Sequence, residues 1–167
     1  VATARARGLD VRQGGIEVFD GQAGYFDAIT MSHVIEHVFD PPQVVQRVHA
    51  LLKPDGIFWL DTPNIESLGA RHFGGDWRGL ETPRHLVLFT PKSLRELLRG
   101  AGFANVRQHW RGMTVFNVYA ESEAMRTQGS ARGATSDGNP PMRHIRAELR
   151  EMLQPARREF LTFSARK

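Results

Sequence analysis

Cysteine is absent from this chain of 167 residues, and its absence excludes both disulfide bridges and thiolate metal sites. No apolar run approaches the roughly 20 residues that a membrane-spanning helix needs. Residues 1–8 are small and basic and lack the apolar core of a secretory signal peptide. The chain also lacks an initiator Met, so we expect it to begin inside a longer protein. These absences favour a cytoplasmic location.

An excess of charge of either sign is missing from most of the chain. The net charge is +4, and residues 142–167 account for all of it with seven Lys or Arg against three Asp or Glu. A protein that binds nucleic acid usually carries a basic face on its folded domain. The balanced charge of residues 1–141 therefore gives no reason to expect a nucleic-acid partner.

Apolar periodicity and turn residues divide the chain into alternating strands and helices. Asp40 and Thr90 each stand before proline, a combination typical of a helix start because the capping side chain precedes a residue that needs no backbone donor. Helices are expected at 1–7, 41–52, 91–101 and 142–167, the last interrupted at Pro155, and strands at 9–12, 26–31, 57–60, 106–110 and 114–120. Residues 53–56 are expected to form a turn, and 62–89 a long functional loop with short helical pieces.

This order predicts an α/β fold with a mostly parallel sheet and helices on both faces. The two final strands, 106–110 and 114–120, have no helix between them and predict a C-terminal antiparallel hairpin. We therefore expect a partial domain at 1–125, a flexible linker at 126–141 rich in Gly, Ser, Asn and Pro, and a basic amphipathic helix at 142–167.

Two stretches carry a resemblance to a known family. The first reads F-D-A-I-T-M-S-H-V-I-E-H-V-F-D-P-P followed by L-L-K-P-D-G-I-F-W-L-D-T-P-N, and the second, 83–103, reads P-R-H-L-V-L-F-T-P-K-S-L-R-E-L-L-R-G-A-G-F. Together they resemble the ubiquinone/menaquinone branch of the class I S-adenosylmethionine-dependent methyltransferases over roughly residues 1–120. Asp55 stands where that family usually has glycine.

The resemblance implies a seven-stranded Rossmann-like sheet with S-adenosylmethionine at the carboxyl ends of the strands, which is also where ligands bind in open α/β sheets generally. It predicts that Gly14, Gly15 and Ile16 lie beside the adenine. It also predicts that Ser32 and His33 lie beside the methionine part of the cofactor. Gly15 stands where relatives often have an acidic or polar residue.

The family's first strand, its glycine-rich loop and its ribose-binding acid have no counterpart in this sequence, so the resemblance implies a fold that lacks its first strand or strands. A sheet without that strand has an exposed edge, and an unpaired edge invites pairing with another chain. We therefore expect weak cofactor binding by this chain alone and an oligomer formed through the edge.

His33, Glu36 and His37 spell H-x-x-E-H, a pattern known from inverted zinc peptidases. The motif follows a strand directly, and Asp40-Pro41-Pro42 soon interrupts any helix that contains it. A zinc peptidase needs the motif inside a long helix, with a third protein ligand elsewhere. Some relatives are thought to hold Mg²⁺ at these spacings, but His33 replaces an expected acid and Mg²⁺ prefers oxygen ligands. The favoured interpretation has no metal: Glu36 and His37 order the loop beside the cofactor.

The long loop contains the candidates for the acceptor side of the site. His85 is a candidate general base that takes a proton from a hydroxyl acceptor, or alternatively a structural histidine bonded to backbone. Trp77 and Arg84 are candidates for an aromatic or anionic substrate pocket. Trp77 alternatively anchors the loop against the core.

The hypothesis for the parent protein is methyl transfer from S-adenosylmethionine to an oxygen, nitrogen or carbon of a small molecule. The rival hypothesis is a non-enzymatic interaction module built on a truncated methyltransferase fold. The basic segment 142–167 suggests peripheral contact with an anionic membrane, although Glu148, Glu151 and Glu159 dilute its charge and favour a helix that packs on the domain or on a partner.

Overall fold

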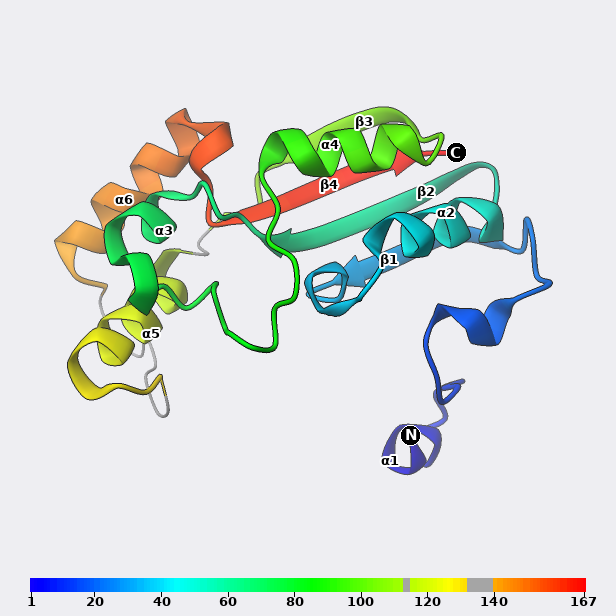
Figure 1. The fold of residues 1–167 in the computed structure, drawn as a ribbon, viewed down its shortest axis with the longest axis horizontal. Coiled ribbons are helices and arrows are strands. Elements are labelled where there is room, and N and C mark those ends of the chain that lie inside the picture. Colours follow the sequence, from blue (N-terminus) through cyan, green and yellow to red (C-terminus); the bar gives the residue numbers. More distant parts are fainter. Residues whose placement is uncertain (113–114, 132–139) are drawn as a thin grey trace.

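The computed structural model describes residues 1–112, 115–131 and 140–167, and these form a four-stranded sheet with helices at one face and one end (Figure 1). The strands are β1 (Phe26–Ser32), β2 (Leu52–Pro63), β3 (Ala104–His109) and β4 (Phe160–Arg166). The α-helices are α1 (Ala2–Arg5), α2 (Pro41–Leu51), α3 (Leu68–Phe73), α4 (Pro91–Gly100), α5 (Val115–Gln128) and α6 (Met142–Leu153). Four 3₁₀ turns complete the list: η1 (Ile16–Phe19), η2 (Ile35–His37), η3 (Gly74–Asp76) and η4 (Pro155–Arg157).

The sheet has the strand order β1-β2-β4-β3. β1 pairs with β2 in parallel, and β4 lies antiparallel between β2 and β3, so three of the four strands run in one direction. β1 is an edge strand among the described residues, with most of its side chains exposed or half-buried. The expected α/β class is confirmed, with a sheet that combines parallel and antiparallel strands.

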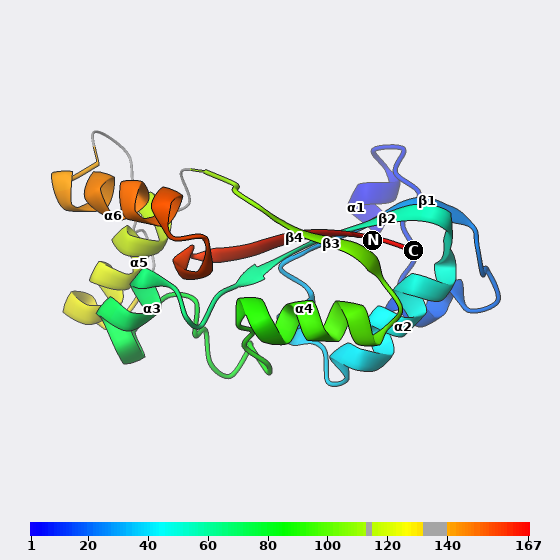
Figure 2. The ribbon, with the colours of Figure 1, turned by 90° about the horizontal axis from the view of Figure 1, so that it is seen from above.

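The helix starts predicted from Asp40 and Thr90 are both confirmed. Asp40 Oδ1 accepts a hydrogen bond from the Gln43 amide at 2.9 Å. Thr90 and Ser93 form a reciprocal capping box at the start of α4. The apolar faces of α2 and α4 then pack on the same side of the sheet, around Val48, Leu94 and the inward-facing residues of β2 and β4 (Figure 2).

Helices cover only one face of the sheet in the described part of the chain, which differs from the expected two. Along β2, Phe58 and Leu60 are buried against α2 and α4, whereas Ile57 and Trp59 on the other face are each 38% exposed. The alternation shows a strand with one covered and one open face.

Four further expectations are wrong. Residues 9–12 form no strand; Leu9 is exposed, and in the described residues no strand lies beside this segment. The expected turn at 53–56 lies within β2 as a bulge, where Asp55 has a φ of +62°. Residues 115–120 begin α5, not a strand, because Val115, Val118, Tyr119 and Ser122 recur at helical spacing on its buried face.

The fourth wrong expectation is the C-terminal helix at 142–167. α6 ends at Leu153, and residues 160–166 form β4, whose aromatic and β-branched side chains suit a central strand. β4 is therefore antiparallel to both β2 and β3, and its pair with β3 is no hairpin, because α5 and α6 lie between the two strands in the chain. α5 also extends over 126–128 of the expected linker, and 132–139 of that linker lie outside the described residues.

A second, smaller core lies at the end of the molecule where α3, α5 and α6 gather (Figure 1). Phe73, Trp77, Val115 and Tyr119 are its main buried residues. No helix among the described residues is both long and apolar enough to cross a bilayer. The carboxyl ends of β1 and β2 thus meet a helical layer, and the space between them is the candidate site.

Candidate functional site

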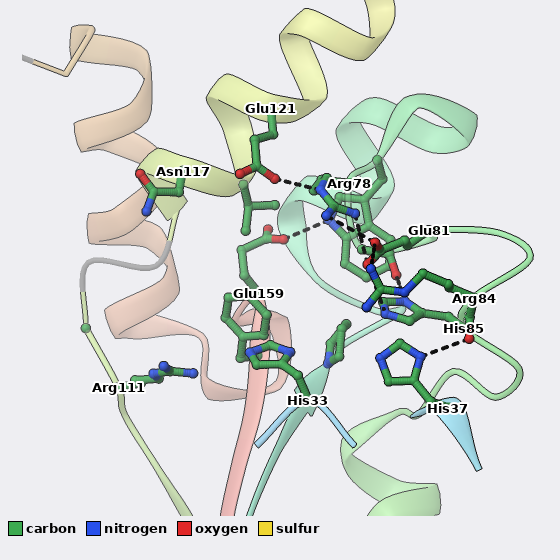
Figure 3. A pocket seen from close by; sticks show the side chains of 16 residues that line it. His33, His37, Arg78, Glu81, Arg84, His85, Arg111, Asn117, Glu121 and Glu159 are labelled. Carbon is green, nitrogen blue, oxygen red and sulfur yellow. Dashed lines mark hydrogen bonds and ion pairs between the residues drawn. The ribbon is translucent and has the colours of Figure 1, made fainter. Parts of the chain in front are cut away.

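A cavity of about 540 Å³ lies where the carboxyl ends of β1 and β2 face the layer of α3 and α5 (Figure 3). Its lining comes from the segment after β1, the loop 77–85, the segment after β3, α5 and the start of β4. Volumes of this order suit small-molecule sites, and parallel strands commonly present ligands at their carboxyl ends. Its position therefore agrees with the sequence prediction.

His33 directly follows Ser32, the last residue of β1, and the strand thereby places it at the cavity. Its backbone has a φ of +54°, an uncommon conformation for a residue other than glycine. The ring bridges two carboxylates, with Nδ1 3.4 Å from Glu36 Oε1 and Nε2 3.4 Å from Asp61 Oδ2. Hydrogen bonding to Glu36, together with the charge of Asp61, raises the pKa of His33.

Glu36 is a fully buried carboxylate on η2. Its Oε2 accepts a hydrogen bond from Thr62 Oγ1 at 3.0 Å, whereas its Oε1 has no well-aligned hydrogen bond among the described residues and only a longer contact of 3.4 Å with His33 Nδ1. Burial opposes the charged form, but hydrogen bonds from His33, the backbone and Thr62 outweigh it and lower the pKa of Glu36. A charged carboxylate oxygen thus faces the histidines of the site.

Glu36, His37 and His85 could together hold a metal ion. Each offers one ligand atom, and these atoms lie within 4.8 Å of one another. His37 Nε2 lies 3.9 Å and His85 Nε2 4.0 Å from the unpartnered Glu36 Oε1. Two imidazoles and one carboxylate suit zinc or another transition metal better than Mg²⁺. Only residues 35–37 of the motif lie on a helical segment, the short 3₁₀ turn η2, so the long helix that a zinc peptidase needs is absent here.

His85 is almost fully buried, and its ring is fixed from two sides. Nδ1 lies 2.7 Å from the carbonyl oxygen of Gly79, which can only accept, so Nδ1 carries the proton and donates it. Nε2 is then the reactive atom, 3.3 Å from Glu81 Oε2. Both Glu81 and Glu36 can stabilise a proton that arrives on Nε2, which is an arrangement suited to a general base.

Arg84 belongs to a network of charges along the loop and α5. Its Nη1 donates to Glu81 Oε1 at 2.7 Å, and its side chain is 68% exposed. Arg78 pairs with both Glu81 and Glu121, at 3.0 and 2.7 Å. The loop is thereby tied to α5 across the cavity, and the Arg84 guanidinium stays accessible to a ligand.

Trp77 lines the cavity, but its indole is only 1% exposed. Its Nε1 donates to Glu159 Oε2 at 2.9 Å, and the same carboxylate accepts from the amide of Gly69 and the hydroxyl of Ser67. Burial raises the pKa of Glu159. These contacts fit the alternative in which Trp77 anchors the loop to the core.

The residues predicted to bind the cofactor are not brought together. His33 lines the cavity, whereas Ser32, Gly14, Gly15 and Ile16 do not. Ser32 is exposed at the end of β1. Residues 14–16 lie at the start of η1, which Figure 1 shows well away from the carboxyl end of β1. The Gly15 amide donates to its neighbour Glu17 at 2.7 Å.

Sequence reasoning missed several charged residues in the cavity or next to it. Arg111, after β3, forms an ion pair with the buried Asp61, whose Oδ1 accepts from Thr162 Oγ1 at 2.6 Å. Asp61 had a detectable signal, because it directly follows the predicted strand 57–60. Arg111 and Glu121 had none, because only the packing of distant segments brings them to the cavity.

Comparison with known proteins identifies the domain. A family model described as a methyltransferase domain matches residues 4–108, more than half of the chain. A ubiquinone biosynthesis O-methyltransferase from Methylocella silvestris is 33% identical over 93 residues, which cover 47% of this chain and 36% of that protein. A protein of the same name from Actinobacillus pleuropneumoniae is 43% identical over 61 residues, covering 34% and 26%. The chain thus spans about a third of these relatives.

Solved structures show the same fold. A SAM-dependent methyltransferase from Thermotoga maritima matches 99% of this chain and 68% of its own, with a TM-score of 0.60 and 18% identity. One from Archaeoglobus fulgidus matches 94% and 66%, with a TM-score of 0.56 and 19% identity. Because the methyltransferase-domain model matches residues 4–108, more than half of the chain, this chain belongs to the methyltransferase-domain family.

Proposed function

We propose that the protein containing this chain transfers a methyl group from S-adenosylmethionine to a small-molecule acceptor. The observation that carries the proposal is the cavity at the carboxyl ends of β1 and β2, with His33 at the end of β1, in a methyltransferase domain. The Haemonchus contortus phosphoethanolamine N-methyltransferase 2, which shares this fold at a TM-score of 0.54 and 14% identity and covers 92% of this chain and 36% of its own, was solved with S-adenosyl-L-methionine.

In this proposal the cofactor lies on the β1 side of the cavity, beside His33 and next to Ser32, whereas Gly14, Gly15 and Ile16 lie away from the cavity and take no part in it. The acceptor lies beside the loop 77–85. The reaction is an in-line displacement at the sulfonium methyl carbon, so the protein mainly has to hold donor and acceptor in line. A cavity closed on two sides by rigid elements suits that task.

The acceptor side rests on the loop. His85 lines the cavity, and its Nε2 takes the proton of a hydroxyl acceptor, because the Gly79 carbonyl holds Nδ1 as the donor and leaves Nε2 as the nitrogen that accepts. The exposed guanidinium of Arg84 contacts an anionic group of the acceptor. Trp77 contributes a buried wall and holds the loop in place through Glu159.

A divalent transition metal at Glu36, His37 and His85 is a variant of this proposal, favoured by the unpartnered Glu36 Oε1. Such an ion would supply Lewis-acid charge at the acceptor. We expect titration calorimetry of the chain with Zn²⁺ or Mn²⁺ to show stoichiometric binding that His37→Ala abolishes and His72→Ala, an exposed histidine outside the cavity, leaves intact. Absence of heat with both ions contradicts the variant and leaves the favoured interpretation without metal.

Titration calorimetry with S-adenosylhomocysteine tests the main proposal. We expect weak but measurable binding by this 167-residue chain alone, weakened about tenfold further in His33→Asn, because asparagine tolerates a positive φ and so keeps the backbone while it removes the imidazole. His72→Asn is the matched control. No heat from a chain that circular dichroism shows to be folded would overturn cofactor binding by this chain and favour the rival hypothesis of a non-enzymatic module.

A further inference from the structure

α6 lies at the end of the molecule where α3 and α5 gather, away from α2 and α4 (Figures 1 and 2), and its outer face carries apolar and basic side chains. We define this outer face by Met142, Arg146, Leu149, Arg150, Met152 and Leu153. Its apolar members are unusually open: Met142 is 64%, Leu149 54%, Met152 44% and Leu153 83% exposed. At 100° per residue, Met142, Leu149 and Leu153 align within about 40° along the helix.

The acids of this region point the other way. Glu148 and Glu151 lie on the inner side of α6, 8% and 1% exposed, and Glu159 follows the helix with no exposed surface. In the sequence these three acids lower the net positive charge of residues 142–167, but in the folded protein they are buried. The charge that α6 presents outward is therefore the charge of its arginines.

The arginines are placed to meet an anionic surface. Arg146 and Arg150 lie one turn apart on the outer face, and neither forms an ion pair with a described residue. Arg143, at the flank, pairs with Glu123 at 2.8 Å and so is already neutralised. Interfacial helices combine such basic residues with exposed Leu and Met, which insert into the boundary between headgroups and acyl chains.

We propose that the outer face of α6 docks on an anionic phospholipid bilayer. Leu149, Met152 and Leu153 enter the boundary region, and Arg146 and Arg150 contact the lipid phosphates. The chain continues from α6 through η4 to Glu159 and Phe160, which line the cavity, so the docked helix lies next to the candidate site. The docking does not depend on the proposed methyl transfer.

Co-sedimentation with vesicles tests the proposal. We expect the chain to sediment with phosphatidylcholine vesicles that contain phosphatidylglycerol and to stay in solution with pure phosphatidylcholine. Arg146→Glu with Arg150→Glu should weaken partitioning at least about tenfold, since each basic residue near an anionic surface contributes to binding. Lys92→Glu with Arg99→Glu on α4 makes the same charge change elsewhere and should have little effect.

The apolar contribution needs its own pair of variants. Leu149→Ser with Leu153→Ser should also weaken partitioning about tenfold, because it removes apolar surface that leaves water on docking. Leu9→Ser with Tyr25→Ser, at exposed sites near the N-terminus, is the control. All four double variants change exposed residues, and thermal unfolding verifies that each is folded.

Three results would overturn the proposal. The first is wild-type protein that does not sediment with anionic vesicles. The second is equal loss in the α4 control, which would mean that net charge alone drives adsorption. The third is a wild-type dimer in sedimentation equilibrium that becomes a monomer in Leu149→Ser with Leu153→Ser, which would make the outer face of α6 a contact between two copies of the chain.

Discussion

At the scale of single residues, Trp77 and Glu159 show how a loop is held to a core. The predicted loop 62–89 begins with the last two residues of β2 and then contains only short helical pieces and an isolated bridge between Asn64 and Phe89. Its position depends on buried polar contacts, because the Glu159 carboxylate collects donors from three separate points of this loop. Removing one donor leaves a buried carboxylate oxygen without one of its hydrogen bonds, which lowers the free energy of unfolding.

We therefore expect Trp77→Phe to lower the free energy of unfolding by about 2 kcal/mol, because it deletes the hydrogen bond from Nε1 to Glu159. Urea denaturation measures the effect. Trp59→Phe is the matched control, since Trp59 is 38% exposed and stacks on His109, and it should cost less than about 1 kcal/mol. Equal costs for the two substitutions would contradict an anchoring role for Trp77.

The predicted site residues form two groups, those that line the cavity and those that lie away from it. His33, His85 and Arg84 were predicted and reach the cavity, because each follows a strand end or lies in the loop beside it. Gly14, Gly15 and Ile16 were predicted from the resemblance alone, and the structure places them elsewhere. Their predicted strand at 9–12 does not form, so nothing orients that segment toward the carboxyl end of β1.

At the scale of elements, local signals identified α2 and α4 well. Each has a capping side chain, a proline in the first turn and an apolar face at helical spacing, so three independent local effects agree. The start of α5 was predicted to be a strand because Val115, Phe116, Val118 and Tyr119, four of its first six residues, are aromatic or β-branched. Burial of Val115, Val118 and Tyr119 against α3 and α6 outweighs that preference.

The cap of α4 gives a prediction at this scale. Thr90→Ala should lower the free energy of unfolding by about 1 kcal/mol, because the Ser93 amide at 3.0 Å loses its acceptor. Thr90→Ser keeps the hydroxyl and should stay close to the wild type. Thermal or chemical unfolding of both variants decides the matter, and a Ser variant as unstable as the Ala variant would assign the effect to the lost methyl group instead.

At the scale of the whole molecule, the second core contains acidic groups held away from water. Burial, together with the charges of Glu159 and Glu148, raises the pKa of Glu151 to about 9. Burial also raises the pKa of Glu159. The folded protein thus binds more protons than the unfolded chain across neutral pH, and folding favours the neutral carboxyl groups.

The sign of the pH dependence follows from these shifts. A carboxyl whose pKa is raised by folding stabilises the protein fully below its unfolded pKa and loses that contribution as pH rises through its folded pKa. We expect the free energy of unfolding to decrease from about pH 5 to about pH 9, and Glu151→Gln, which is permanently neutral, to show a shallower decrease. Urea denaturation at several pH values measures both slopes, and parallel slopes would contradict the assignment to Glu151.

The sequence by itself determined the α/β class, the caps of α2 and α4, strands β1 and β3, the loop over the site and the resemblance to methyltransferases. All of these depend on contacts within a few residues or on a motif. Only the tertiary structure decided that residues 160–166 enter the sheet between β2 and β3, that Arg111 meets Asp61, and that Glu148, Glu151 and Glu159 are buried while the apolar side chains of α6 are exposed. Those outcomes depend on which distant segments pack together, and the packing energy of distant segments leaves no local pattern in the chain.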